Sequence, residues 1–324
     1  MPVRTCVVLC TFNGEAFVAE QVAGVLAQLQ PVDEIVVSDD ASTDACVDRV
    51  REALAGFGGD LRIHVNPATL GVVRNFETAL RLAKGDVCFL CDQDDVWRAD
   101  KVQWMVAAFA REPQLMLLHS GARIIDKSGA RTGATLLSEL RVRARDLAAY
   151  DAGDALSVLL HRNIVTGATV AVRRELLDLA LPIPEGYWHD EWLALIAAAV
   201  GSIRRIDEPL IDYRIHKGNQ AGLRGVMPGV RIRAAVSRRG GFHAVRARKL
   251  DALLERLRCL GSRVPVARLH LVEACRDHWR LRANLPQRRT ERVASILAEW
   301  RGGRYRRFSN GWRAALRDLV EPLP

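Results

Sequence analysis

Short apolar runs alternate with longer amphipathic segments over the first hundred residues. Runs rich in β-branched residues predict strands, and apolar positions that recur every three to four residues predict helices between them. The expected strands are residues 4–10, 34–40, 61–66 and 86–91, and the expected helices are residues 17–29, 44–55, 72–83 and 99–110. This alternation predicts an α/β fold with a mostly parallel sheet flanked by helices and joined by right-handed crossovers.

The pattern changes further along the chain. Residues 114–213 mix strand-like runs, a turn-bearing hairpin and an amphipathic helix expected over residues 191–200. Arg-rich helical segments follow, and we expect helices at residues 244–260, 266–283 and 292–301. We therefore divide the chain into an α/β domain of residues 1–222 and a basic, α-helical C-terminal extension of residues 223–324.

Composition excludes several classes of protein. The 324 residues are 49% hydrophobic and 26% charged, as in a globular chain that buries a core, and unlike a disordered or collagen-like one. The longest charge-free apolar run, residues 193–203, is shorter than the ~20 residues that cross a bilayer. The N-terminus lacks the pattern of a secretory signal, so we expect the protein in the cytoplasm. Seven cysteines, mostly within apolar segments, are expected as reduced core thiols.

Charge is divided unevenly along the chain. The net charge is +9, yet residues 224–324 carry 24 Lys and Arg against 8 Asp and Glu, whereas residues 1–223 carry 23 against 30. The segment GWRAALRDLV near the C-terminus has apolar residues at helical spacing and two arginines. We expect these basic helices to bind the anionic cytosolic membrane surface, with simple packing on the body as the alternative. No recognised nucleic-acid motif accompanies the arginines, so we expect no nucleic-acid partner.

Polar residues follow the expected strands, at the sheet edge where parallel sheets bind ligands. The first strand is followed by TFNGE, the second ends in SDD, and the fourth is followed by DQDD. Carboxylates gathered at one edge repel each other, and a divalent cation such as Mg²⁺ or Mn²⁺ relieves this repulsion. A bound metal also implies a diphosphate that shares it.

Three kinds of site fit acidic strand ends to different degrees. A dinucleotide-binding site requires GxGxxG after the first strand, and TFNGEAF has one glycine. The segment DQDDV resembles the nucleophile element of haloacid-dehalogenase-type phosphatases, with Asp92 as nucleophile, but that element normally ends the first strand of its fold. A nucleotide-sugar transferase, whose DxD carboxylates bind the metal of the donor diphosphate, accounts for the other strand ends as well. A non-catalytic sugar-nucleotide-binding protein stays as a further alternative.

Six segments together resemble the successive motifs of family 2 glycosyltransferases with the GT-A fold. They are CTFNGEAFVAEQVAGVLAQ, EIVVSDDASTD, LGVVRNFETALRL, GDVCFLCDQDDVW, YWHDEWLALIAAAVG and YRIHKGNQAG. The last two are similar to the rhamnosyltransferase-like bacterial branch, and the resemblance covers residues 4–222. It implies metal-dependent, inverting transfer of a sugar from a dTDP- or UDP-sugar, and rhamnose is the best candidate for the transferred sugar. The acceptor implied is a hydroxyl group of a lipid-linked or oligosaccharide precursor of a bacterial surface glycan such as O-antigen.

The resemblance also implies roles for individual residues. The nucleotide- and donor-binding set is Thr11, Asn13, Glu15, Asp39, Arg74, Asn75 and Asp92. Asp39 would accept a hydrogen bond from the imide N–H of uracil or thymine, for which a carboxylate is a suitable acceptor. Asp94 would bind the metal directly, with Asp92 beside it and His216 as a possible third ligand.

On the acceptor side, the segment YWHDEW supplies the expected base. An inverting transfer requires a group that takes the proton of the attacking hydroxyl, and family members carry a carboxylate at the position of Asp190. Glu191 is the neighbouring candidate, but adjacent helix residues diverge by ~100°, so both cannot face the cleft equally. Trp188 and Trp192 are expected to pack against sugars.

Overall fold

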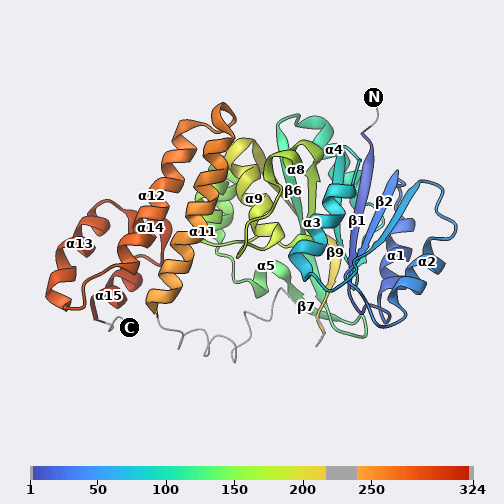
Figure 1. Ribbon diagram of the computed structural model, residues 1–324, viewed down its shortest axis with the longest axis horizontal. Helices are drawn as coiled ribbons and strands as arrows, with labels where there is room; N and C mark the ends of the chain where they lie inside the picture. Colours follow the sequence, from blue (N-terminus) through green and yellow to red (C-terminus); the bar gives the residue numbers. More distant parts are fainter. Residues whose placement is uncertain (1–2, 217–238, 321–324) are drawn as a thin grey trace. The chain divides into compact units, whose positions relative to one another are not determined.

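The structure is a computed structural model that describes residues 3–216 and 239–320 (Figure 1). Contacts within the chain group it into two compact units. The first consists of Met1–Leu147 and Ile164–Leu223, and the second of Ala148–Asn163 and Arg224–Pro324. Residues 148–163, which we placed in the α/β domain from the sequence, therefore pack with the second unit. Among the described residues, no helix is both long and apolar enough to cross a bilayer.

Strands and helices alternate at the start of the first unit as the hydrophobic pattern predicts, except for a short strand at residues 96–97 that the pattern did not predict. In order they are β1 (Thr5–Thr11), α1 (Val18–Leu26), β2 (Glu34–Asp39), α2 (Cys46–Leu54), β3 (Asp60–Val65), α3 (Val72–Leu82), β4 (Val87–Asp92), β5 (Val96–Trp97) and α4 (Lys101–Arg111). The later elements are β6 (Leu115–Ile125), β7 (Arg131–Thr135), α5 (Leu136–Glu139), the short 3₁₀ helix η2 (Gly167–Thr169), β8 (Val170–Arg173), α8 (Arg174–Ala180), α9 (His189–Val200) and β9 (Ser202–Arg214).

One mixed, mostly parallel sheet of nine strands forms the framework of the first unit. Its order is β3-β2-β1-β4-β8-β6-β9-β5, with β7 paired to β6. The pairs β1/β2, β2/β3, β1/β4 and β6/β9 are parallel, and β8 is antiparallel to both of its neighbours. The register sets Thr11 beside Asp39 and Cys10 beside Asp92, so the polar ends of three strands meet at one edge.

Helix α9 differs from the sequence expectation. It begins at His189 instead of residue 191, and every residue from Trp192 to Ala199 is buried. The expected amphipathic helix is therefore enclosed on nearly all sides, and its alanines allow close packing against α8 and β9. Six of the seven cysteines are buried and all are free thiols, in agreement with the expected reduced core; Cys259 is exposed.

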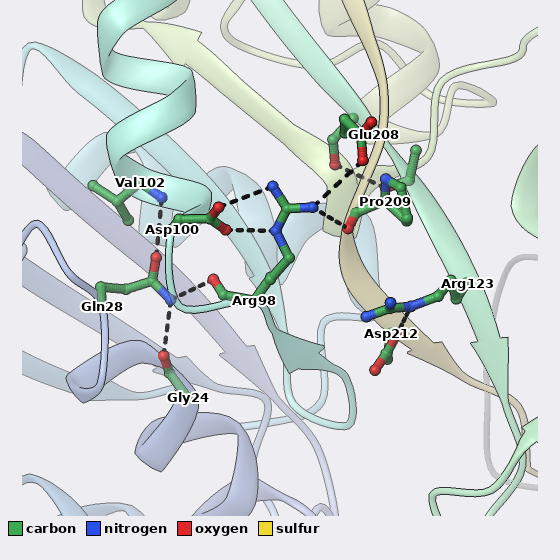
Figure 2. Close-up of polar contacts among 11 residues, drawn as sticks. Gly24, Gln28, Arg98, Asp100, Val102, Arg123, Glu208, Pro209 and Asp212 are labelled. Atoms are coloured by element: carbon green, nitrogen blue, oxygen red, sulfur yellow. Dashed lines mark hydrogen bonds and ion pairs between the residues drawn. The ribbon is translucent and has the colours of Figure 1, made fainter.

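A polar cluster fixes the segment that follows β4 and β5 (Figure 2). The amide of Gln28 donates to the carbonyl oxygens of Gly24 and Arg98, and its oxygen accepts from the backbone N–H of Val102. The guanidinium of Arg98 pairs with Asp100 and with Glu208 of β9, the latter at 3.6 Å. These contacts connect α1, the start of α4 and β9 through the short segment between β5 and α4.

The second unit is helical in its described part. Helix α6 (Ala144–Ala149) spans the junction, and the unit continues with η1 (Tyr150–Asp154), α7 (Ala155–His161), α11 (Arg239–Cys259), η4 (Gly261–Arg263), α12 (Val266–Ala283), α13 (Arg289–Arg301), α14 (Arg304–Phe308) and α15 (Trp312–Val320). The three expected helices correspond to α11, α12 and α13. A small apolar core of Leu285, Ile296, Tyr305 and Ala314 joins the last helices.

Candidate active site

A cavity of about 350 Å³ opens at the polar edge of the sheet, beyond the ends of β1 and β4. Six of the residues proposed from the sequence line it: Thr11, Asn13, Asn75, Asp92, Asp94 and His216. Its apolar wall includes Phe17 of the β1–α1 loop and Phe76 of α3. The remaining candidates, Glu15, Asp39, Arg74, Trp188, Asp190, Glu191 and Trp192, are not among its lining residues.

The carboxylates of Asp94 and Asp190 act electrostatically on Asp92 at the end of β4. Burial, together with the negative charges of Asp94 and Asp190, raises the pKa of Asp92 to about 7. Burial is also the main reason that the pKa of Asp190 rises to about 7, with the charge of Glu191 contributing. Residues almost a hundred positions apart thus share one electrostatic environment.

Asp94 and His216 are the best-placed pair of metal donors. The Oδ2 atom of Asp94 lies 2.7 Å from Nε2 of His216, and both side chains are largely buried. Across residues 3–216 and 239–320, no group of three or more His, Cys, Asp or Glu side chains is arranged to hold a metal ion. Of the three expected ligands, Asp94 and His216 are in direct contact, and Asp92 lines the same cavity. Two protein donors suit a Mg²⁺ or Mn²⁺ ion that takes its other ligands from a diphosphate and water.

Arg214 contacts the backbone of Asp94 and the ring beside His216. Arg214 was not among the site residues predicted from the sequence. Its Nε donates to the backbone oxygen of Asp94 at 2.8 Å, and its Nη2 pairs with Glu20 at 2.6 Å. The guanidinium lies over the ring of Phe17, whose centroid is 4.7 Å from that of His216. Arg214 is the last residue of β9 and His216 follows two residues later, so the basic residue near the expected ligand His216 was a usable signal.

Lys101 is a second functional candidate that the sequence did not reveal. It is fully buried, donates to the carbonyl oxygen of Ala168 at 2.9 Å, and lies 3.8 Å from the ring centroid of Trp97. Burial lowers its pKa to about 8, while the charges of Asp95 and Asp92 oppose that shift. Lys101 is therefore a buried amine whose positive charge interacts with the carboxylates of Asp92 and Asp95.

The residues expected to bind base and ribose mainly form hydrogen bonds that connect the loop after β1 to the loop after β2. Thr11 Oγ1 and Ser42 Oγ both donate to Asp39 Oδ2, at 2.7 and 2.6 Å. Asn13 Oδ1 accepts from the backbone N–H of Thr43 at 2.8 Å. Glu15 similarly accepts from the N–H of residue 45, at 3.2 Å. Thr11 and Asn13 still face the cavity, whereas Asp39 and Glu15 act within the loops.

Helix α3 separates the two residues expected to contact the donor together. Asn75 is buried, accepts from Ser38 Oγ at 2.7 Å and donates to the carbonyl oxygen of Ser38 at 2.9 Å. Arg74 instead pairs with Glu77 at 2.7 Å and donates to the carbonyl oxygen of Ile183 at 3.0 Å. Adjacent helix residues diverge by about 100°, so packing Asn75 inward turns Arg74 away from the cavity.

Asp190 lies in the first turn of α9 with both oxygens held by backbone donors. The N–H of Gly167 reaches Oδ2 at 3.1 Å, and the N–H of Glu191 reaches Oδ1 at 2.6 Å. The preceding residue, His189, is buried and stacks on Phe76 with ring centroids 4.0 Å apart. Neither His189 ring nitrogen has a hydrogen-bond partner within the described chain, and burial lowers its pKa to about 3.

The two tryptophans expected on the acceptor side have different surroundings. Trp192 is fully buried and donates from Nε1 to the carbonyl oxygen of Ala180 at 2.7 Å, which makes it a core residue. Trp188 is 45% exposed. It precedes the helix in an extended conformation, so its side chain does not follow the helical spacing of Trp192. Only Trp188 is accessible to an acceptor.

Gln93, the middle residue of the DQD segment, is hydrogen-bonded to the loop after β1. Its Oε1 accepts from the N–H of Phe12 at 2.8 Å, and its Nε2 donates to the carbonyl oxygen of Phe12 at 3.0 Å. A Cβ atom on Gly14 would lie 2.2 Å from Gln93 Oε1, so glycine is required for this approach.

Related sequences share part of the chain. It is 29% identical over 214 residues to an uncharacterized protein of Mycobacterium bovis, a match that covers 65% of this chain and 58% of the relative. It is 28% identical over 229 residues to an uncharacterized glycosyltransferase of Nostoc, covering 67% and 66%. The chain thus covers less than two thirds of either relative. A shorter match, 28% over 99 residues, links it to a dTDP-rhamnosyl transferase of Shigella flexneri and covers 29% of this chain and 34% of that protein.

Solved structures share the fold. S. aureus TarS 1-349, crystallised with UDP-GlcNAc, superposes with a TM-score of 0.52 at 16% identity, covering 93% of this chain and 92% of that one. The mannosyltransferase PcManGT of Pyrobaculum calidifontis, in complex with GDP-Man and Mn²⁺, gives 0.50 at 21% identity, covering 98% and 79%. The family model for glycosyl transferase family 2 matches residues 6–178, more than half of the sequence. The chain therefore belongs to glycosyl transferase family 2 and has the GT-A fold.

Proposed function

We propose that this chain is a glycosyltransferase that moves a sugar from a dTDP- or UDP-linked donor to a hydroxyl group, with inversion at the anomeric carbon. The best candidate for the sugar is rhamnose. The proposed acceptor is a bacterial surface-glycan precursor such as O-antigen. The observation that carries the proposal is that Asp92 and Asp94 line one cavity while the negative charge of Asp190 is near enough to raise the pKa of Asp92. The short match to a dTDP-rhamnosyl transferase supports the choice of sugar. The UDP-sugar complex of TarS is consistent with a pyrimidine nucleotide.

Asp190 is the proposed base. As the acceptor oxygen forms its bond to the anomeric carbon, the bond from that carbon to the diphosphate oxygen breaks, and Asp190 takes the hydroxyl proton. A pKa of about 7 suits this role, because the carboxylate is available near neutral pH and still basic enough to accept a proton. The N–H groups of Gly167 and Glu191 keep the carboxylate in a fixed orientation.

Asp94 and His216 are the proposed ligands of a divalent cation, with Asp92 adjacent. Mg²⁺ or Mn²⁺ held there would supply positive charge to the departing nucleoside diphosphate. Arg214 maintains the separation of the two donors, since it bonds the backbone of Asp94 and its guanidinium stacks on the ring that contacts His216. Thr11 and Asn13 are the proposed contacts to the nucleoside, within loops that Asp39 and Glu15 hold together.

We also propose that the enzyme works at the cytosolic face of the membrane. Residues 224–324 carry 24 Lys and Arg against 8 Asp and Glu, a balance that favours association with anionic lipid. Peripheral association would bring the chain to a lipid-linked acceptor.

The test is nucleoside diphosphate release from UDP- and dTDP-sugars in the presence of Mn²⁺. The wild type should release nucleoside diphosphate, and Asp190→Asn should lose that activity while still binding nucleotide. Asp178→Asn, at an exposed carboxylate on α8, is the matched control and should behave as wild type. Undiminished release by Asp190→Asn would reject Asp190 as the base. Binding without turnover would indicate a sugar-nucleotide-binding protein, and release of inorganic phosphate would indicate a phosphatase that uses Asp92.

A further inference from the structure

Helix α15 presents an apolar stripe to solvent. Trp312, Leu316 and Val320 are 60%, 49% and 43% exposed, and their spacing of four residues places them on one side of the helix. Arg313 and Arg317 are exposed beside them, and the guanidinium of Arg313 lies 5.5 Å from the ring centroid of Trp312. Two other apolar residues of the helix, Ala315 and Leu319, pack against the core of the second unit.

The opposite side of α15 is firmly attached to the second unit. Ala314 belongs to the small core of that unit. The carboxylate of Asp318 is buried, accepts from Arg282 at 2.6 and 3.1 Å, and accepts from the hydroxyl of Tyr305 at 2.8 Å. The backbone oxygen of Asp318 accepts from Arg292 at 2.9 Å. The attachment therefore fixes which side of the helix faces outward.

These contacts also decide the charge of the outward side. Asp318 is the single acidic residue of α15, and the attachment neutralises it inside the unit. The side that carries Trp312, Leu316 and Val320 is left with the two positive charges of Arg313 and Arg317. A stripe of this composition matches the bilayer interface, where an indole ring lies at headgroup depth, aliphatic side chains reach the acyl boundary and guanidinium groups bind lipid phosphates.

We propose that this face of α15, formed by Trp312, Leu316, Val320, Arg313 and Arg317, docks on the surface of an anionic lipid bilayer. The inference deepens the proposed function and rests on it, because it names the surface by which the enzyme would reach a lipid-linked acceptor. Charge favours lipid over a second copy of this chain, since two copies of such a face would bring like charges together.

The experiment is vesicle flotation of the full chain with phosphatidylcholine vesicles and with vesicles that also contain phosphatidylglycerol. We expect partitioning only onto the anionic vesicles and weakening with added salt. Trp312→Ser with Leu316→Ser should reduce the partition coefficient by about tenfold or more, because two interfacial side chains are lost. Arg313→Gln with Arg317→Gln should reduce it and flatten the dependence on phosphatidylglycerol.

Leu26→Ser with Leu29→Ser, which removes an exposed apolar pair from the first unit, is the matched control and should float as wild type does. Circular dichroism of each variant verifies that the helices are retained. Equal flotation of the Trp312/Leu316 variant and the wild type would overturn the proposal. So would equal binding to neutral vesicles, or self-association in solution that the same variant abolishes. Nucleoside diphosphate release from a soluble donor, measured without vesicles, separates a failure of docking from a failure of the proposed function.

Discussion

Replacement of Asp190 by asparagine removes a carboxyl group whose ionisation the fold opposes. Burial raises the pKa of this group from its ordinary value of 3.8 to about 7. Ionisation of Asp190 at neutral pH therefore lowers the free energy of unfolding of the wild type. The asparagine amide does not ionise, so the variant does not have this loss of stability. The variant should lose transfer activity by roughly 10²- to 10⁴-fold, the usual contribution of a general base, and yet be the more stable protein.

The magnitude follows from the shift. A rise of about three pKa units corresponds to at most about 4 kcal/mol of unfolding free energy at pH values above the folded-state pKa. Below the unfolded-state pKa both states hold the proton and the cost is absent. Between the two values the folded state keeps a proton that the unfolded state has lost, so the stability of the wild type falls as pH rises. Loss of one of the two backbone hydrogen bonds in the amide costs about 1 kcal/mol.

Urea unfolding followed by tryptophan fluorescence measures the difference between variant and wild type. We expect Asp190→Asn to gain about 2.5 kcal/mol relative to the wild type between pH ~5 and pH ~8, and to be the more stable protein at the upper end. Asp178→Asn, at an exposed ion pair, should show no such trend. A stability difference that does not change with pH, or one that moves in the opposite direction, would refute the reasoning about Asp190.

Four further outcomes follow from the site. Chelation should abolish nucleoside diphosphate release, and Mn²⁺ or Mg²⁺ added back should restore it in a metal titration. Arg214→Met should weaken Mn²⁺ binding by about tenfold in calorimetry, because its bond to the DQD turn is lost. Gly14→Ala should lower kcat/KM by forcing Gln93 away from the loop after β1, whereas Gly56→Ala, with open space around it, should not. The pH profile of kcat/KM should fall tenfold per unit below pH ~7 as Asp190 takes up a proton, and a flat acid limb would contradict its role as base.

Much of the fold could be predicted because hydrophobic residues recur with different spacings in strands and in helices, and the sequence shows both spacings. The alternation of the first hundred residues corresponds to β1 through α4, and the parallel register explains why Thr11 meets Asp39 and Cys10 meets Asp92. Polar residues at these strand ends had to converge once the sheet formed. The cavity beside Asp92 could therefore be anticipated without coordinates.

What the sequence could not supply was the rotation of each helix and the partner of each polar side chain. Arg74 and Asn75 are adjacent in the chain, but packing decides which of them faces the sheet, and Asn75 does. Trp192 has the polar neighbours of a binding residue, but α9 is enclosed by other elements and buries it. Long-range partners, such as Arg214 with the backbone of Asp94, exist only after the strands are ordered in space.

The path of residues 148–163 has a practical consequence for any attempt to exchange parts of this protein with those of a relative. Helix α7 within that segment buries each of its residues from Ala155 to Leu160, and it contacts α12 and α14. A chimaera that replaced only the residues after 222 would graft foreign helices onto a native α7 that was shaped for different neighbours. Because residues 148–163 and the C-terminal helices pack as one unit, an exchange of parts should move them together.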